Sequence, residues 1–192
     1  MTDKKGYILL TNTGTLFTKL IKLYTKKTYN HASFALDADL TEVYSFGRKS
    51  TRNPFIGGFV KEDMKTSLFN QADCAIYSFE VSEDQIEKMK HYIQEIEAAK
   101  KQYRYNFIGL FGFIFNKPIN RKKAFFCSQF VASVLEEGKI TDFEKPLSLI
   151  APNDLQKLSN LHLVYQGKLK DYTNRNVDEK ARFPFQLHSI GA

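Results

Sequence analysis

The chain contains no tryptophan and little cysteine: among its 192 residues, only Cys74 and Cys127 carry a thiol. Two cysteines allow one disulfide, but they are too few for the disulfide framework of many small secreted domains. A chain of this length can bury a core of its own without cross-links. We therefore expect two free thiols in a reducing compartment.

Long uninterrupted apolar runs are also missing. The first apolar segment, Tyr7-Ile8-Leu9-Leu10, is followed at once by Thr11-Asn12-Thr13, so it is too short for the apolar region of a signal peptide. No segment approaches the roughly 20 apolar residues that a membrane-spanning helix needs. These absences predict a cytoplasmic protein.

Several sequence motifs that indicate a particular catalytic or ligand-binding chemistry are absent. The sequence has no glycine-rich phosphate loop, no Gly-x-Gly-x-x-Gly, no Cys-x-x-Cys, no His-Glu-x-x-His and no Gly-x-Ser-x-Gly. A zinc site would need scattered ligands, and we expect neither a metal nor an organic cofactor. Carboxylates are plentiful but fall mostly on predicted helix surfaces, so no paired-acid site can be singled out.

The charge is strongly basic, with a formal net charge of +7 and a pI near 9.2. Such a charge permits contact with an anionic lipid surface or another anionic polymer. The lysines and arginines occur in many short pairs rather than one block, which favours a solvated basic surface. We expect no nucleic-acid partner and treat peripheral contact with an anionic surface as an open alternative.

The segment Ala124–Leu135 predicts an amphipathic helix that begins near Cys127. Counting three, four, seven and eight residues from Cys127 gives Phe130, Val131, Val134 and Leu135, which places the thiol on the buried face. A thiol in the first turn faces free backbone N–H groups and the positive end of the helix dipole, which stabilise a thiolate. Cys127 is therefore either a nucleophile or a small core residue, and the helix alone favours the core residue.

A nucleophilic thiol needs a base, usually histidine, and the chain offers four. His91 lies off the apolar stripe of its helix, His188 lies near the end of the chain, and His162 adjoins a strand. His31 opens a predicted strand over residues 31–37, which pairs with residues 42–46 as a β-hairpin. Active-site residues often stand at such strand starts, so His31 ranks first.

The remaining pattern predicts alternating strands and helices in one domain. We expect strands at residues 7–10, 74–81 and 161–166, helices at 16–26, 82–101 and 151–155, and a loop at 48–63. Ser82 and Gln85 predict a capping box. The aromatic stretch from Tyr103 to Phe115 is a core segment, a groove wall or a lipid-facing patch.

In this order, three segments resemble the circularly permuted papain-like cysteine hydrolases. They are Asn30-His31-Ala32-Ser33-Phe34, then Phe126-Cys127-Ser128-Gln129-Phe130-Val131, then Ala151-Pro152-Asn153-Asp154-Leu155. This NlpC-type superfamily includes YiiX-like proteins and relatives similar to lecithin–retinol acyltransferase. The resemblance implies an α+β fold in which an antiparallel sheet or half-barrel packs against helices, with residues 1–170 as a single domain and 171–192 as an extended tail.

The resemblance also implies roles for particular residues. Cys127 would be the nucleophile, His31 the general base, and a polar residue on the next strand would orient the imidazole. Glu42 and Tyr44 are the candidates for that third position, and we choose Glu42 because a carboxylate stabilises an imidazolium. The segment around Pro152 matches a structural feature of the family.

Three functions follow from these residues. The first is a hydrolase that cleaves an amide bond in a peptide, a muropeptide or an isopeptide-like substrate. The second is a lipid acyltransferase or esterase, favoured by the aromatic Tyr103–Phe115 stretch and by the basic residues of the predicted first helix. The third is a binding module that keeps the fold without the chemistry.

Overall fold

A computed structural model describes residues 4–13, 28–49 and 56–174 of the chain. Six strands form one antiparallel sheet in the order β4-β3-β2-β1-β5-β8. Their bounds are β1 Lys4–Asn12, β2 His31–Ala35, β3 Val43–Arg48, β4 Gly57–Glu62, β5 Asp73–Val81 and β8 His162–Lys168. This arrangement confirms the predicted α+β class with an antiparallel sheet.

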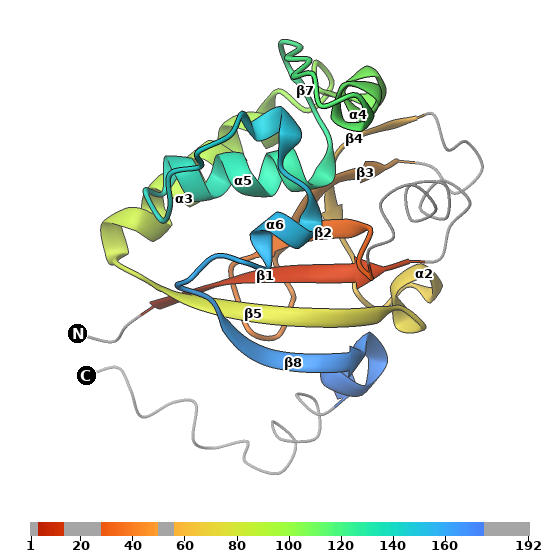
Figure 1. The fold of residues 1–192 in the computed structure, drawn as a ribbon. Helices are drawn as coiled ribbons and strands as arrows, with labels where there is room; N and C mark the ends of the chain where they lie inside the picture. The colour runs from red at the N-terminus through yellow and green to blue at the C-terminus, as the bar shows by residue number, and fades with distance from the viewer. Residues whose placement is uncertain (1–3, 14–27, 50–55, 175–192) are drawn as a thin grey trace.

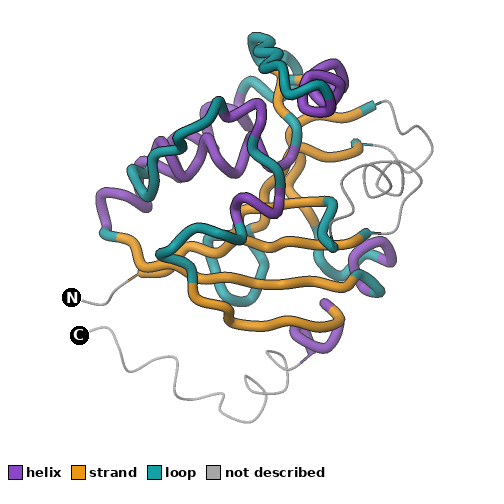
Figure 2. The backbone as a smooth tube through the Cα atoms, in the orientation of Figure 1, coloured by secondary structure: helices purple, strands orange, loops and turns teal. Residues whose placement is uncertain are grey.

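Helices pack on this sheet, as Figure 1 and Figure 2 show. The helices include α2 Ser67–Asn70, α3 Glu83–Ala98, α4 Phe107–Ile114, α5 Cys127–Glu137, the 3-10 turn η1 Leu147–Leu149 and α6 Pro152–Leu155. Two short strands, β6 Arg104–Tyr105 and β7 Ala124–Phe125, pair in parallel and stand at the starts of α4 and α5.

The alternation of residues along each central strand explains why both sheet faces are covered. On one face, Ile8, Phe34 and Phe79 join buried residues of α3 and α5 in the larger core. On the other face, their neighbours Leu9 and Ala35 pack in a smaller core with residues such as Cys74, Phe69 and Tyr172. Successive side chains of a strand point to opposite faces, so these strands read as continuous apolar runs.

Several predicted elements are present in the structure. The strands near residues 7–10, 31–35, 43–46, 74–81 and 162–166 form, and α5 begins at Cys127. The capping box of α3 forms as predicted: the backbone N–H of Gln85 donates to the Ser82 hydroxyl, and the backbone N–H of Ser82 donates to the Gln85 side chain. The predicted helix at residues 16–26 lies outside the described residues.

Two predictions about irregular segments are wrong. Residues 57–62, expected to lie in a loop, form strand β4. Residues 171–174, assigned to an extended tail, continue a helical segment that follows β8, and the Tyr172 hydroxyl donates a hydrogen bond to the Ala38 carbonyl. In that segment Leu169 and Tyr172 are buried, so the smaller core extends past residue 170.

The described residues include no helix with the length and apolar character needed to traverse a bilayer.

Candidate active site

The local structure around Cys127 places its thiol at the first position of a helix. Strand β7 leads into Phe126, whose extended backbone (φ −104°, ψ 170°) ends the strand and allows α5 to start at the next residue. The Ser128 hydroxyl donates a 2.6 Å hydrogen bond to the Ile150 carbonyl, which ties this helix start to the segment before α6. Of the N–H groups that a helix start leaves free, that of Ser128 interacts with the sulfur.

His31 is held at the first residue of β2. It pairs with Thr11 of β1, and the backbone N–H of the preceding Asn30 donates to the Thr11 carbonyl at 3.0 Å. The Asn30 side chain donates to Asn12 and accepts from the backbone N–H of Thr13. These bonds fix the strand start, so the imidazole has a defined position opposite α5, which packs against β2.

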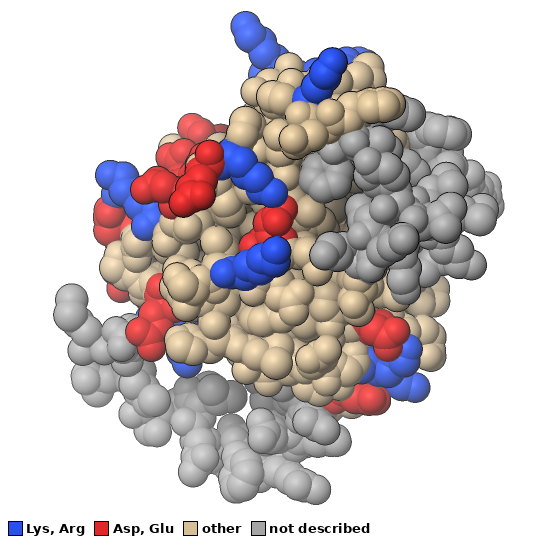
Figure 3. Space-filling model, viewed as in Figure 1, with Lys and Arg blue, Asp and Glu red and all other residues tan. Residues whose placement is uncertain are grey.

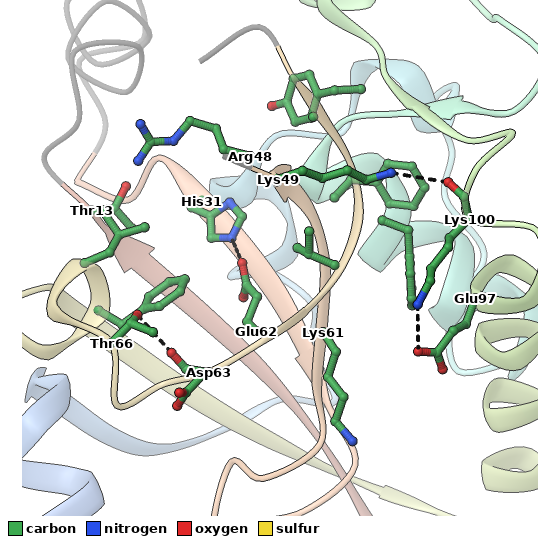
Figure 4. Close-up of a pocket in the computed structure, with 18 of the residues that line it drawn as sticks. Thr13, His31, Arg48, Lys49, Lys61, Glu62, Asp63, Thr66, Glu97 and Lys100 are labelled. Carbon is green, nitrogen blue, oxygen red and sulfur yellow. Dashed lines mark hydrogen bonds and ion pairs between the residues drawn. The ribbon is translucent and has the colours of Figure 1, made fainter. Parts of the chain in front are cut away.

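The structure brings Cys127 and His31 together. Each side chain shifts the pKa of the other through its charge and its hydrogen-bonding capacity, although the two residues are 96 positions apart in the sequence. The Nε2 atom of His31 lies 2.8 Å from Oε1 of Glu62 on β4, as Figure 4 shows. Because Nε2 is occupied by Glu62, Nδ1 is the ring nitrogen left for the sulfur. The thiol, the imidazole and the carboxylate thus form a triad in which the imidazole lies between the other two groups.

Glu42, the predicted third residue, is not part of this triad. Its carboxylate accepts a hydrogen bond from the Tyr44 hydroxyl and lies 3.6 Å from the Lys61 ammonium. The choice of Glu42, and equally of Tyr44, as the partner of the imidazole is corrected to Glu62. The physical reason is that a further strand, β4, pairs with β3 at the edge of the sheet. Glu62 lies on β4, and its carboxylate reaches His31 from there.

Two serines hold the Glu62 carboxylate. The Ser33 hydroxyl donates to Oε2 at 2.5 Å, and the Ser45 hydroxyl donates to Oε1 at 2.7 Å. Both serines are fully buried, and the Glu62 side chain is only 6% exposed. Burial raises the pKa of this carboxyl, but the His31 charge and the hydrogen bonds from His31 and the two serines outweigh burial and lower it. Glu62 is therefore ionised.

The charges of the three groups support one another. Burial disfavours an imidazolium, but the Glu62 carboxylate and the Cys127 sulfur raise the pKa of His31 to about 10. Burial likewise disfavours a thiolate, but His31 and the backbone N–H groups of Ala32 and Ser128 lower the pKa of Cys127. The arrangement favours a thiolate–imidazolium pair, the form of a thiol that attacks carbonyl groups.

Tyr105 is a site residue that sequence reasoning missed. Its hydroxyl is hydrogen-bonded to the Cys127 side chain and to the Cys127 backbone N–H, and burial together with the charge of Cys127 raises its pKa well above the usual value. It therefore remains a neutral O–H donor beside the sulfur. The sequence contained one signal, an unusually aromatic segment, but nothing in that segment separated Tyr105 from its neighbours.

A pocket of about 740 Å³ opens beside these groups. Its wall includes His31, Glu62 and Tyr105, and also Phe46, Phe59 and Phe69. Cys127 is 6% exposed and does not itself line the pocket, but His31 and Tyr105, the two side chains that interact with its sulfur, do.

The other predicted or possible site residues lie apart. His91 and His162 are exposed, and His91 lies 3.3 Å from Glu95 on its own helix. Cys74 is buried in the smaller core, where burial raises its pKa to about 12. In the part of the chain that the structure describes, no group of three His, Cys, Asp or Glu side chains is placed to hold a metal ion.

Comparisons of the sequence with protein-family models and with curated proteins found no match.

Proposed function

We propose that this protein is a cysteine hydrolase that cleaves an amide bond through an acyl-enzyme intermediate. The observation that carries the proposal is the triad of Cys127, His31 and Glu62. A thiol at a helix start, hydrogen-bonded to an imidazole that a buried carboxylate orients, is the arrangement that thiol-dependent acyl transfer requires. Neither a metal nor an organic cofactor enters the scheme.

The reaction follows from the positions of these groups. The Cys127 sulfur attacks the substrate carbonyl carbon, and the negative charge that develops on the carbonyl oxygen is stabilised by the Tyr105 hydroxyl and N–H groups at the start of α5. The His31 imidazolium gives its proton to the leaving nitrogen as the C–N bond breaks. Water then gives a proton to His31 and attacks the thioester, which releases the acid and restores the thiolate–imidazolium pair.

The fold supports the same proposal. An antiparallel sheet carries the histidine on a strand early in the chain, and the cysteine helix follows later and packs against that strand. This is the order implied by the resemblance to circularly permuted papain-like hydrolases of the NlpC type. A fold can carry many functions, so the proposal is based on the site and uses the resemblance only as support.

The second candidate function is acyl transfer on a lipid, and an exposed surface next to α4 favours it. Ile108 in α4 and Phe115, the residue that follows α4, are 51% and 70% exposed, and apolar side chains exposed together can mark a site of membrane contact. Exposed cationic residues follow them in the sequence, and Figure 3 shows Lys and Arg side chains at the end of the molecule that carries α4. These residues are Lys117, Arg121, Lys122 and Lys123.

Trapping of the acyl-enzyme tests the first proposal. The protein is mixed with 4-nitrophenyl acetate, the reaction is quenched with acid, and the masses of the proteolytic peptides are measured by mass spectrometry. We expect acetyl on Cys127, none on Cys74, and loss of the signal in Cys127→Ala and His31→Gln, but not in the control His162→Gln. Peptidyl amides of aminomethylcoumarin then measure amide cleavage. If acetylation is equal at both cysteines, or is unaffected by His31→Gln, the hydrolase proposal is wrong. The remaining function is then a binding module that keeps the fold without the chemistry.

Vesicle co-sedimentation separates the amide and lipid candidates. The lipid candidate predicts binding to vesicles of phosphatidylserine and phosphatidylcholine that weakens with salt and is lost in the double variant Ile108→Ser, Phe115→Ser. It also predicts faster turnover of long-chain acyl esters when vesicles are present. Binding that is absent at low salt would remove the lipid candidate and leave amide hydrolysis.

A further inference from the structure

Positive charge predominates in the pocket beside the candidate catalytic groups. Three carboxylates, those of Glu62, Asp63 and Glu97, line it together with five cationic side chains. The cationic residues are Arg48, Lys49, Lys61, Lys100 and Lys101. The pocket is therefore a poor place for a cationic substrate group and a favourable place for an anionic one.

Existing contacts account for only part of this excess. Glu62 is occupied by His31 and the two serines, Glu97 lies 3.9 Å from the Lys100 ammonium, and Lys61 lies 3.6 Å from Glu42. Figure 4 shows the Lys61 side chain pointing away from His31. Among the described residues these contacts leave three pocket cations without a carboxylate partner, namely Arg48, Lys49 and Lys101.

Arg48 differs from the two lysines in its setting. Lys49 and Lys101 are exposed, and the Lys49 ammonium already donates to the Lys100 carbonyl at 3.3 Å. Arg48 is the last residue of β3, is half-buried, and has no acceptor within hydrogen-bonding distance in the described part of the chain. In Figure 4 its guanidinium group extends toward Thr13 on the His31 side of the pocket. Arg48 is thus the one cation of the three that is held partly inside the protein while its N–H donors stay available to a bound anion.

We propose that Arg48 forms an anion subsite that binds a carboxylate or phosphate group of the acyl substrate. This inference rests on the proposed function and specifies its substrate class: an acyl compound with an oxyanion a short distance from the scissile carbonyl. A guanidinium group offers paired N–H donors that match both oxyanions, which a lysine does not. The exposed Lys49 and Lys101 add attraction at the pocket entrance.

Affinity alkylation of Cys127 tests the subsite without requiring turnover. The reagents are bromoacetyl-glycine, bromoacetyl-β-alanine and bromoacetyl-aminobutyrate, which place a carboxylate at increasing distance, each paired with its neutral amide. Bromoacetyl-aminomethylphosphonate supplies the phosphate-like arm. In each case the sulfur displaces bromide and forms a thioether with the methylene carbon. The measured quantity is the rate of Cys127 alkylation, read from its peptide.

We expect one carboxylate or phosphonate reagent to react faster than its neutral counterpart by about tenfold to a hundredfold, the factor expected for a charge-assisted hydrogen bond. Arg48→Gln should abolish that advantage and Arg48→Lys should keep part of it. The control Arg121→Gln removes an exposed arginine outside the pocket and should leave it unchanged. A faster carboxylate indicates a peptide-like acid, and a faster phosphonate a phosphorylated substrate.

The outcomes separate the two proposals. If neutral reagents modify Cys127 far faster than Cys74 but no anionic reagent gains an advantage, the subsite is wrong and the hydrolase proposal remains. An advantage that persists in Arg48→Gln also overturns the assignment to Arg48. If the neutral reagents do not favour Cys127 over Cys74, the nucleophile itself is wrong. Thermal unfolding of each variant shows whether a lost advantage reflects lost folding.

Discussion

Glu62 determines the charge state of the imidazole more than any other residue does. Its carboxylate lies 2.8 Å from Nε2 of His31, and the serine hydroxyls hold its oxygens in place. The pKa of His31, although opposed by burial, is raised to about 10 mainly by this carboxylate. The imidazolium therefore persists through neutral pH and can protonate a leaving group.

Glu62→Gln should narrow the pH range of activity on the alkaline side. Without the negative charge the pKa of His31 falls, so the imidazolium is lost at a lower pH and the alkaline limb of kcat/KM moves down. Turnover at neutral pH should fall by on the order of a hundredfold. The control is Glu42→Gln, which removes a carboxylate bound to Tyr44 and Lys61. An alkaline limb that moves equally in both variants would contradict the role of Glu62.

Substitution of Tyr105 should affect two reactions of the Cys127 sulfur differently. Its hydroxyl is a neutral donor beside Cys127, where the oxygen of a tetrahedral intermediate would form. Tyr105→Phe should lower acyl transfer by about a hundredfold to a thousandfold. Alkylation by iodoacetamide forms no oxyanion, so its rate should change little. Equal losses in both reactions would show that Tyr105 only shapes the site.

At the scale of elements, the close approach of β6 to β4 explains a misread signal. Gly57 and Gly58 look like turn residues in the sequence, which is why residues 48–63 were predicted to be a loop. In the structure a Cβ on Gly57 would lie 2.8 Å from the Tyr105 Cβ, and one on Gly58 would lie 2.9 Å from the Tyr103 carbonyl oxygen. The glycines are strand residues that admit a neighbouring backbone.

Gly57→Ala should therefore damage the site through Tyr105. The added methyl group meets Tyr105 on one side and the Gly47 carbonyl at 3.0 Å on the other, so β6 must shift. We expect acyl transfer to fall at least about tenfold and stability to fall by roughly 1–3 kcal/mol. Gly138→Ala is the control, because its added methyl group meets the Met89 side chain and not Tyr105. A similar loss of acyl transfer in both variants would contradict this account.

The sequence predicted short-range features well and one long-range contact poorly. The apolar stripe from Phe130 to Leu135 indicated α5 and placed Cys127 at its start, because helix periodicity is a local property. The partner of His31 depends on which strand lies beyond β3. No local pattern marked Glu62, since its strand begins with two glycines and its contacts come from residues far away in the sequence.

At the scale of the whole molecule, the two cysteines report on different parts of the fold. Cys74 is 1% exposed within the smaller core, and burial raises its pKa to about 12. It can react only after β5 and its neighbours separate. Cys127 interacts with His31 and Tyr105, which line the pocket, and its reactivity depends on the folded arrangement of His31 and α5.

Urea should therefore move the two reactivities in opposite directions. In a brief pulse of iodoacetamide, modification of Cys74 should rise with urea in step with the loss of the far-ultraviolet circular dichroism signal. Modification of Cys127 should fall over the same range, because unfolding removes the groups that lower its pKa. Full reaction of Cys74 without urea would show that the smaller core is open in the native protein.

The most direct measurement of the central claim is the alkylation rate of Cys127 as a function of pH. A free cysteine titrates near pH 8.5, so its reactivity drops steeply below that value. A thiolate paired with the His31 imidazolium should keep a nearly constant rate from about pH 8.5 down into the acidic range, and His31→Gln should remove this acidic plateau. A rate that instead follows the titration of a free cysteine, in the native protein and the variant alike, would contradict the account.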